Sequence, residues 1–107
     1  MEEEFKGKGG FVFKMVGPLL GKGAKGEVRK ATCLSHNKIK PTVCKFVNGH
    51  KLIAEEDWPE EEIKKQMDNE ISAGKQFNNL PNFVTLYDYV VKDTYNYYIL
   101  MEYVKGP

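Results

Sequence analysis

Three glycines near the start of the chain have the spacing of a loop that could hold phosphate. Gly21, Gly23 and Gly26 stand in the pattern G-x-G-x-x-G-x-V, which ends at Val28. Glycine lets the backbone bend tightly and approach a ligand without obstruction by a side chain. Backbone N–H groups in such a loop can point at phosphate oxygens. A flexible hairpin turn is the plainer alternative for the same residues.

The residues after this loop separate two kinds of nucleotide site. A dinucleotide-binding Rossmann loop opens a helix and has an acidic residue about 20 positions further on. Here Gly26 is followed by Glu-Val-Arg-Lys-Ala-Thr-Cys, whose alternation is typical of a strand. A dinucleotide-binding domain is therefore the weakest of the nucleotide-binding interpretations.

A lysine and a glutamate further along the chain could meet as an ion pair. Lys45 lies in a β-branched segment, where alternation puts it on one face with Val43 and Val47. Glu70 falls on the apolar stripe of an expected helix. The other members of that stripe are Ile63, Met67, Gly74 and Phe77. A carboxylate there is costly to bury unless a cation meets it, so we expect Lys45 as its partner. An edge-strand charge for Lys45 and a rim position for Glu70 are the alternatives.

The elements that must position these residues follow from the periodicity of the sequence. Strand patterns cover residues 11–20, 27–33, 42–47, 83–91 and 95–103, with Gly17-Pro18 as a kink in the first. A helix covers 60–77, where Asp57 can cap its start. Residues 1–10 are polar and Gly-rich and are expected to form a flexible tail, and 48–58 a polar connection. The sequence thus predicts an α+β fold over 11–107, a five-stranded antiparallel sheet with one packed helix.

Composition excludes several general functions. The 107 residues carry a formal net charge of +1, which gives no general reason to expect binding to nucleic acid or to a membrane. No apolar run approaches the length of a membrane span. The two cysteines and two histidines lack the spacing of metal ligands, so no metal site is expected within this chain. The acidic N-terminus is unlike a signal peptide, and we expect an intracellular protein with free thiols.

Four motifs in this order resemble a known family. The glycine loop, Lys45 in the setting T-V-C-K, Glu70 on a helix and the closing segment I-L-M-E-Y-V are similar to the N-terminal, ATP-binding lobe of eukaryotic protein kinases. The similarity extends from about Phe11 to Pro107. It implies that the three glycines cradle the phosphates of ATP, that Lys45 holds the α- and β-phosphates, and that Glu70 pairs with Lys45.

The same resemblance implies an adenine pocket. The base would contact the side chains of Leu20, Val28, Val43 and Met101. Met101 would lie behind the base, and backbone groups of Glu102 and Val104 would bond its edge. The family usually has alanine at the position of Val43 and a bulky apolar residue at that of Gly74. The first change predicts a tighter pocket, and the second predicts a more loosely docked helix.

The sequence contains neither H-R-D-x-x-x-x-N nor D-F-G. In the family these motifs supply the catalytic base and the Mg²⁺ ligands, and the lobe that carries them also binds the protein substrate. The resemblance therefore implies the ATP-binding part of a Ser/Thr protein kinase that uses ATP and Mg²⁺ but is inactive alone. The alternative is a stand-alone lobe or pseudokinase-like binding module. In either case the helix over 60–77 is the expected surface for a regulatory partner.

Overall fold

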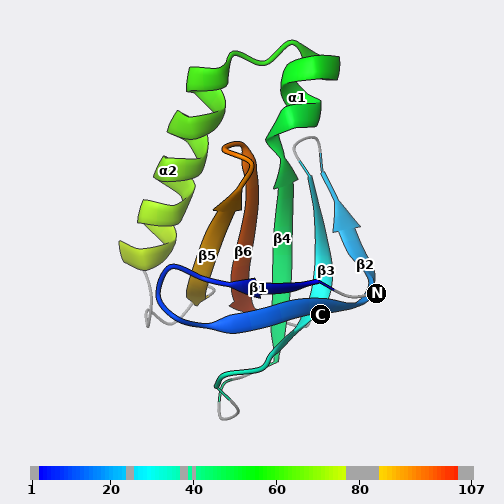
Figure 1. Ribbon diagram of the computed structural model, residues 1–107, viewed down its shortest axis with the longest axis vertical. Helices are drawn as coiled ribbons and strands as arrows, with labels where there is room; N and C mark the ends of the chain where they lie inside the picture. Colours follow the sequence, from blue (N-terminus) through cyan, green and yellow to red (C-terminus); the bar gives the residue numbers. More distant parts are fainter. Residues whose placement is uncertain (1–2, 24–25, 37–38, 40, 77–84, 104–107) are drawn as a thin grey trace.

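The chain forms one antiparallel sheet of six strands (Figure 1). The structure is a computed structural model, which describes residues 3–23, 26–36, 39, 41–76 and 85–103. The strands are β1 (Glu4–Lys6), β2 (Val12–Lys22), β3 (Gly26–Cys33), β4 (Thr42–Asn48), β5 (Leu86–Lys92) and β6 (Asn96–Glu102). Their order in the sheet is β1-β2-β3-β4-β6-β5. Two helices, α1 (Gly49–Glu56) and α2 (Glu60–Gln76), connect β4 to β5.

The prediction of a five-stranded sheet with one packed helix is wrong on both counts. The sheet has six strands, and two helices accompany it. Its edge strands also approach each other, because the Lys8 amide next to β1 donates to the Tyr89 carbonyl of β5 at 2.9 Å. The sheet therefore curls into a nearly closed, barrel-like form rather than an open layer.

The additional strand lies in the segment expected to be a tail. Phe5 of β1 is 2% exposed and pairs with Phe13 of β2. A turn through Gly7 and Gly10 joins the two strands, and Gly10 adopts a φ of 95° that favours glycine. One buried aromatic side chain thus orders a segment whose charge and glycine content suggested fraying.

The additional helix lies in the segment expected to be a polar connection. The side chain of Asn48 accepts a hydrogen bond from the Lys51 amide and so caps α1. Leu52 is 4% exposed, which gives the helix a buried contact. The helix ends at Asp57, whose φ of 55° lies in the left-handed region. With only one buried apolar side chain, α1 gave little periodicity to detect.

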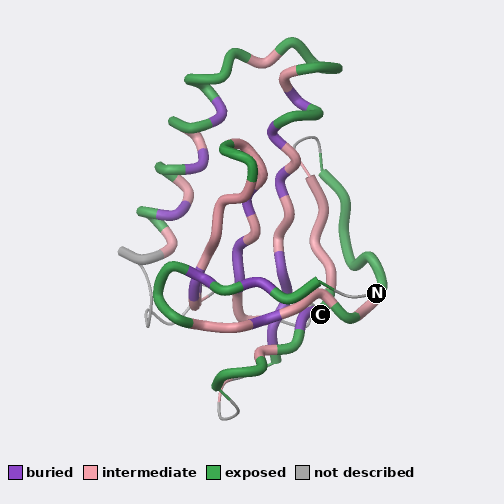
Figure 2. Tube along the Cα trace, in the orientation of Figure 1, coloured by how far each residue is buried: buried purple, intermediate pink, exposed green. Residues whose placement is uncertain are grey.

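The two faces of the sheet bury separate cores. The core beneath α2 consists of Val47, Leu52, Ile63, Met67, Ile71, Leu86, Tyr97 and Ile99. The opposite core consists of Phe5, Phe13, Ala31, Cys44 and Leu100. Figure 1 shows β1 and the first part of β2 crossing in front of the other strands, which is how this second core is covered. In Figure 2 the buried positions lie on the central strands, on these crossing segments and on one side of α2.

Strand β2 can serve both faces because it bends. Its pairing with β3 shifts register between Met15 and Leu19, at the Gly17-Pro18 pair that the sequence identified as a kink. A Cβ on Gly17 would lie 2.5 Å from the Cβ of Lys30, so the close approach of the two strands requires glycine here. The first half of β2 thereby covers one core while the second half extends toward the glycine loop.

Helix α2 is positioned by a stripe that the sequence identified. Ile63 and Met67 of that stripe are each 1% exposed, and Ile71, which was not among its expected members, continues the four-residue spacing at 5% exposed. A Cβ on Gly74 would lie 2.7 Å from Cδ1 of Leu86, so the glycine allows this part of the helix to approach β5 closely. The predicted loosening at Gly74 is therefore not observed. Phe77, also assigned to the stripe, lies outside the described residues.

Candidate functional site

Lys45 and Glu70 form an ion pair between the sheet and α2. The Lys45 ammonium bonds Oε1 of Glu70, and the two side chains are 25% and 32% exposed. Lys45 lies in the middle of β4, directly opposite Val28 of β3 and Ile99 of β6. The Lys45 ammonium therefore extends from a row of apolar cross-strand neighbours and remains partly accessible to solvent. The pairing expected from the sequence is confirmed, whereas its role in a reaction stays a prediction.

Most of the predicted adenine pocket lies on the same face of the sheet as this pair. Val43 precedes Lys45 by two residues and lies opposite Met101 of β6, so both side chains share the face of Lys45. Val28 shares it too, because it pairs directly with Lys45. Val43 is 5% exposed, and Val28 and Met101 are partly buried. The structure thus brings together three of the four side chains that the family resemblance assigned to adenine.

The glycine loop connects β2 and β3 as a hairpin next to this face. Gly21 lies opposite Val28, and the Gly23 amide donates to the Gly26 carbonyl at 2.8 Å. Leu20, the fourth adenine side chain, is 42% exposed on β2. The loop is therefore a strand-to-strand turn, which excludes the Rossmann arrangement in which a helix follows. Residues 24–25 at its tip lie outside the described residues.

The three glycines of the hairpin differ in whether the fold requires them. A Cβ on Gly26 would lie 2.0 Å from the Phe46 carbonyl oxygen, so strand packing excludes a side chain there. A Cβ on Gly21 would meet nothing within 4 Å, and one on Gly23 only the Gly26 carbonyl at 4.0 Å. None of the three adopts a left-handed φ. The described part of the chain gives no reason for glycine at 21 and 23.

The predicted hinge is only partly described. The Glu102 amide donates to the Thr85 carbonyl at 2.8 Å, and the Tyr103 amide donates to the Pro41 carbonyl at 2.7 Å. These bonds hold the end of β6 against neighbouring segments. The carbonyl of Glu102 was assigned to the adenine edge, and this stays a prediction. Val104, the other hinge residue, lies outside the described residues.

The cysteines offer no nucleophile to this site. Both Cys33 and Cys44 are free thiols. Cys44 follows Val43 on β4 and therefore points to the opposite core. Burial raises the pKa of the Cys44 thiol to about 12, which keeps it protonated at neutral pH. Among the described residues, no cluster of three or more His, Cys, Asp or Glu side chains could hold a metal ion.

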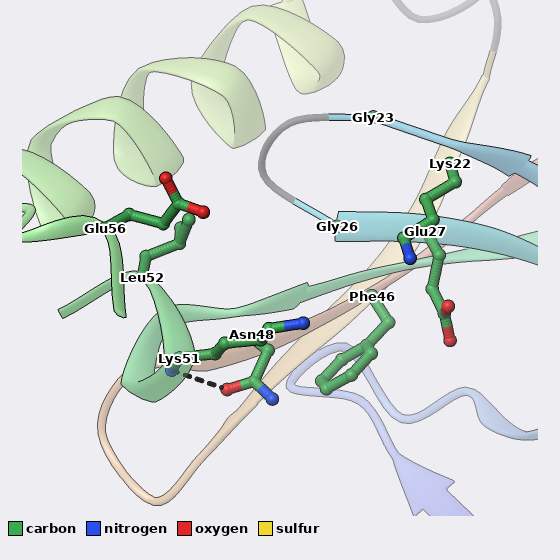
Figure 3. Close-up of a pocket in the computed structure, with 9 residues that line it drawn as sticks. All are labelled: Lys22, Gly23, Gly26, Glu27, Phe46, Asn48, Lys51, Leu52 and Glu56. Atoms are coloured by element: carbon green, nitrogen blue, oxygen red, sulfur yellow. Dashed lines mark hydrogen bonds between the residues drawn. The ribbon is translucent and has the colours of Figure 1, made fainter. Parts of the chain in front are cut away.

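A cavity of about 430 Å³ lies on the other flank of the glycine hairpin (Figure 3). It is lined by Lys22, Gly23, Gly26, Glu27, Phe46, Asn48, Lys51, Leu52 and Glu56. The lining shares Gly23 and Gly26 with the predicted nucleotide site, but it includes neither Lys45 nor Glu70, so the cavity lies on the other side of the shared hairpin. Sequence reasoning missed it because α1 was read as a connection, although Asn48 three residues before Lys51 is a helix-start signal.

Comparison with known proteins finds no protein-family model that matches the sequence. No curated protein matches it either. Neither helix is long and apolar enough to cross a membrane, as far as the described residues extend. The resemblance to protein kinases therefore rests on the sequence motifs alone. The nucleotide site remains a hypothesis about how these residues are arranged.

Proposed function

We propose that this chain binds ATP between the glycine hairpin and the face of Lys45, as the nucleotide-binding part of a Ser/Thr protein kinase. The observation that carries the proposal is the Lys45–Glu70 ion pair, which joins β4 to α2 on an otherwise apolar face. A lysine with only a structural role would be solvated more easily at the edge of the sheet than in the middle of this face. A cation held by a carboxylate, beside a hairpin with unexplained glycines, suits the recognition of phosphate.

The chemistry of each part follows from its position. Glu70 would hold the Lys45 ammonium extended over the sheet, where it offers a positive charge to the α- and β-phosphates. Gly21 and Gly23 would let backbone amides approach the phosphates, because a ligand can use the space that a Cβ would occupy. Val28 and its neighbours on the same face offer apolar contacts to adenine.

Phosphoryl transfer would need groups that the described residues do not provide. Mg²⁺ would neutralise charge between the β- and γ-phosphates, and its ligands in the resembled family lie in the D-F-G and H-R-D-x-x-x-x-N motifs. Glu70, the carboxylate that contacts Lys45, does not fit this task because it is engaged in the ion pair. We therefore assign ATP binding to this chain, and catalysis and protein-substrate binding to a second lobe. The free thiols agree with a reducing, intracellular compartment.

Thermal unfolding of the chain with and without ATP tests the proposal. At about 100 times its Kd, ATP would add roughly 2.7 kcal/mol of stability, a rise in Tm of more than about 10 °C for a domain of this size. Lys45→Met should remove the rise. Lys65→Met, at an exposed position on α2, is the matched control and should retain it.

Two outcomes would reject ATP binding at Lys45. One is an equal rise in Tm for Lys45→Met and the unsubstituted chain. The other is a folded chain whose Tm ATP does not change at any concentration. The second outcome would favour the alternative of a binding module without nucleotide, for which α2 is the expected contact surface.

A further inference from the structure

The cavity beside the glycine hairpin has an uneven distribution of charge. Figure 3 shows the amines of Lys22 and Lys51 extending toward one another across the space beside Phe46. Among the described residues, neither lysine takes part in an ion pair. The two lysines come from different elements, β2 and α1, so the fold and not local sequence brings them together.

The acidic residues of the lining do not neutralise this pair of lysines. Glu27 is bonded by Arg29, with 2.9 Å between Nε and Oε1, and its carboxylate points away from the cavity in Figure 3. Glu56 lies at the opposite end of α1, five residues after Lys51 and thus about 7.5 Å along the helix axis. Lys22 lies directly opposite Glu27 in the pairing of β2 with β3. Because Arg29 engages that carboxylate, positive charge remains in excess at the end of the cavity near Lys22.

An aromatic ring adjoins the two amines. Phe46 lines the cavity and stacks on Tyr98, with 4.8 Å between the ring centroids. Stacking on Tyr98 fixes the plane of the Phe46 ring and keeps it available to a flat ligand. Asn48 completes this end of the cavity and is held in place by the Lys51 amide, which donates to its Oδ1. The α1 N-terminus at this end adds a favourable field for an anion.

We propose that this cavity binds an aryl phosphate, with the phosphate between Lys22 and Lys51 and the ring against Phe46. Two ammonium groups that form no ion pair with a described residue match the double charge of a phosphate monoester better than the single charge of a carboxylate. A volume of about 430 Å³ accommodates a substituted ring together with its phosphate. Phosphotyrosine in a peptide is the natural carrier of this chemistry. The site shares Gly23 and Gly26 with the predicted nucleotide site but no charged residue, and it does not depend on ATP binding.

Calorimetric titration of the full chain with phenyl phosphate tests the proposal. Lys22→Gln and Lys51→Gln should each weaken binding roughly tenfold, because each removes one charge-assisted contact. Lys65→Gln loses the same charge from an exposed position on α2 and should bind as the unsubstituted chain does. Equal affinities for all three variants would overturn the site.

Further probes separate the contributions of the ring, the phosphate and the carrier. Inorganic phosphate should bind at least several-fold more weakly than phenyl phosphate, and Phe46→Leu should abolish that preference; equal binding of both ligands to the unsubstituted chain would overturn the aryl assignment. A phosphotyrosine peptide should compete with phenyl phosphate, whereas its unphosphorylated form should not. If neither peptide competes, the carrier is a small molecule and the assignment to a phosphopeptide is wrong.

Lys45→Met distinguishes this inference from the nucleotide proposal. The variant should bind phenyl phosphate with unchanged affinity, because Lys45 does not line the cavity. Loss of phenyl phosphate binding in Lys45→Met would overturn a separate site, whatever ATP does. Conversely, if ATP does not change the Tm of the chain but phenyl phosphate binds through Lys22 and Lys51, only the nucleotide proposal is refuted.

Discussion

Two carboxylates on opposite faces of the sheet are held in different ways. Asp88 of β5 is 4% exposed and accepts hydrogen bonds from the amides of Gly9, Phe11 and Tyr89 at 2.8–3.0 Å. Glu70 of α2 is 32% exposed and meets the mobile end of a lysine side chain. Backbone amides are fixed by the fold, whereas a lysine ammonium can turn toward another anion.

This difference separates a structural charge from one suited to a ligand. Asp88 ties the turn between β1 and β2 to β5, so its contacts span nearly 80 residues of sequence. A buried carboxylate that is satisfied by backbone amides has little reason to exchange partners. The pair of Lys45 and Glu70 is partly exposed to solvent, so a phosphate could join it at a modest desolvation cost. The comparison predicts that one charge maintains the fold and the other can serve a ligand.

The largest effect on stability is expected for Asp88→Ala. The substitution leaves the amides of Gly9 and Phe11 without their acceptor in a partly buried turn. Hydrogen bonds to a charged group are worth about 1.5–3 kcal/mol each, so we expect a loss of roughly 3 kcal/mol in the free energy of unfolding in urea. Asp68→Ala, at an exposed position on α2, is the control and should change stability by less than about 0.5 kcal/mol. Similar values for the two variants would deny Asp88 a structural role.

An intermediate effect is expected within the glycine hairpin. Gly26→Ala places a Cβ against the Phe46 carbonyl and should cost about 1–3 kcal/mol in the free energy of unfolding. Gly21→Ala meets open space and should leave stability within about 0.5 kcal/mol of the parent chain. If the open space serves ATP, Gly21→Ala should nevertheless reduce the rise in Tm with ATP. A normal ATP response in Gly21→Ala would remove the ligand explanation for that glycine.

The sequence was most informative where a local period was strong. The stripe of α2 and the alternation of β4 placed Glu70 and Lys45 on surfaces that had to face each other, and the ion pair is found. The kink at Gly17-Pro18 was likewise predicted, because the effect of proline and glycine on strand pairing is local and does not depend on tertiary contacts.

The errors arose where a few tertiary contacts decide the structure. β1 has three residues and one buried side chain, Phe5, and its order depends on Asp88 more than eighty residues away. Likewise, α1 buries only Leu52 as an apolar side chain. Short elements of this kind have no periodicity of their own, so their existence follows from packing.

The two lysines of the cavity were beyond sequence reasoning for a related reason. Lys22 was read as a variable position of the glycine loop, and Lys51 as part of a connection. Their convergence depends on the direction in which α1 leaves β4, because this brings Lys51 to the cavity that Lys22 lines from β2 (Figure 3). Once the cap at Asn48 is recognised, Lys51 falls in the first turn of a helix, but only the sheet topology places Lys22 opposite it.

The smallest effect on stability is expected from the ion pair itself. Because both side chains are partly exposed to solvent, a double-mutant cycle of Lys45→Met and Glu70→Gln should give a coupling energy below about 1 kcal/mol in urea unfolding. High salt should reduce this coupling further, since screening acts on exposed charges. Lys45→Met should still lose its response to ATP, which separates function from stability at this residue. A coupling energy near 3 kcal/mol that salt leaves unchanged would mean that the ion pair, like Asp88, maintains the fold. The proposed difference between a structural charge on one face and a ligand-binding charge on the other would then be wrong.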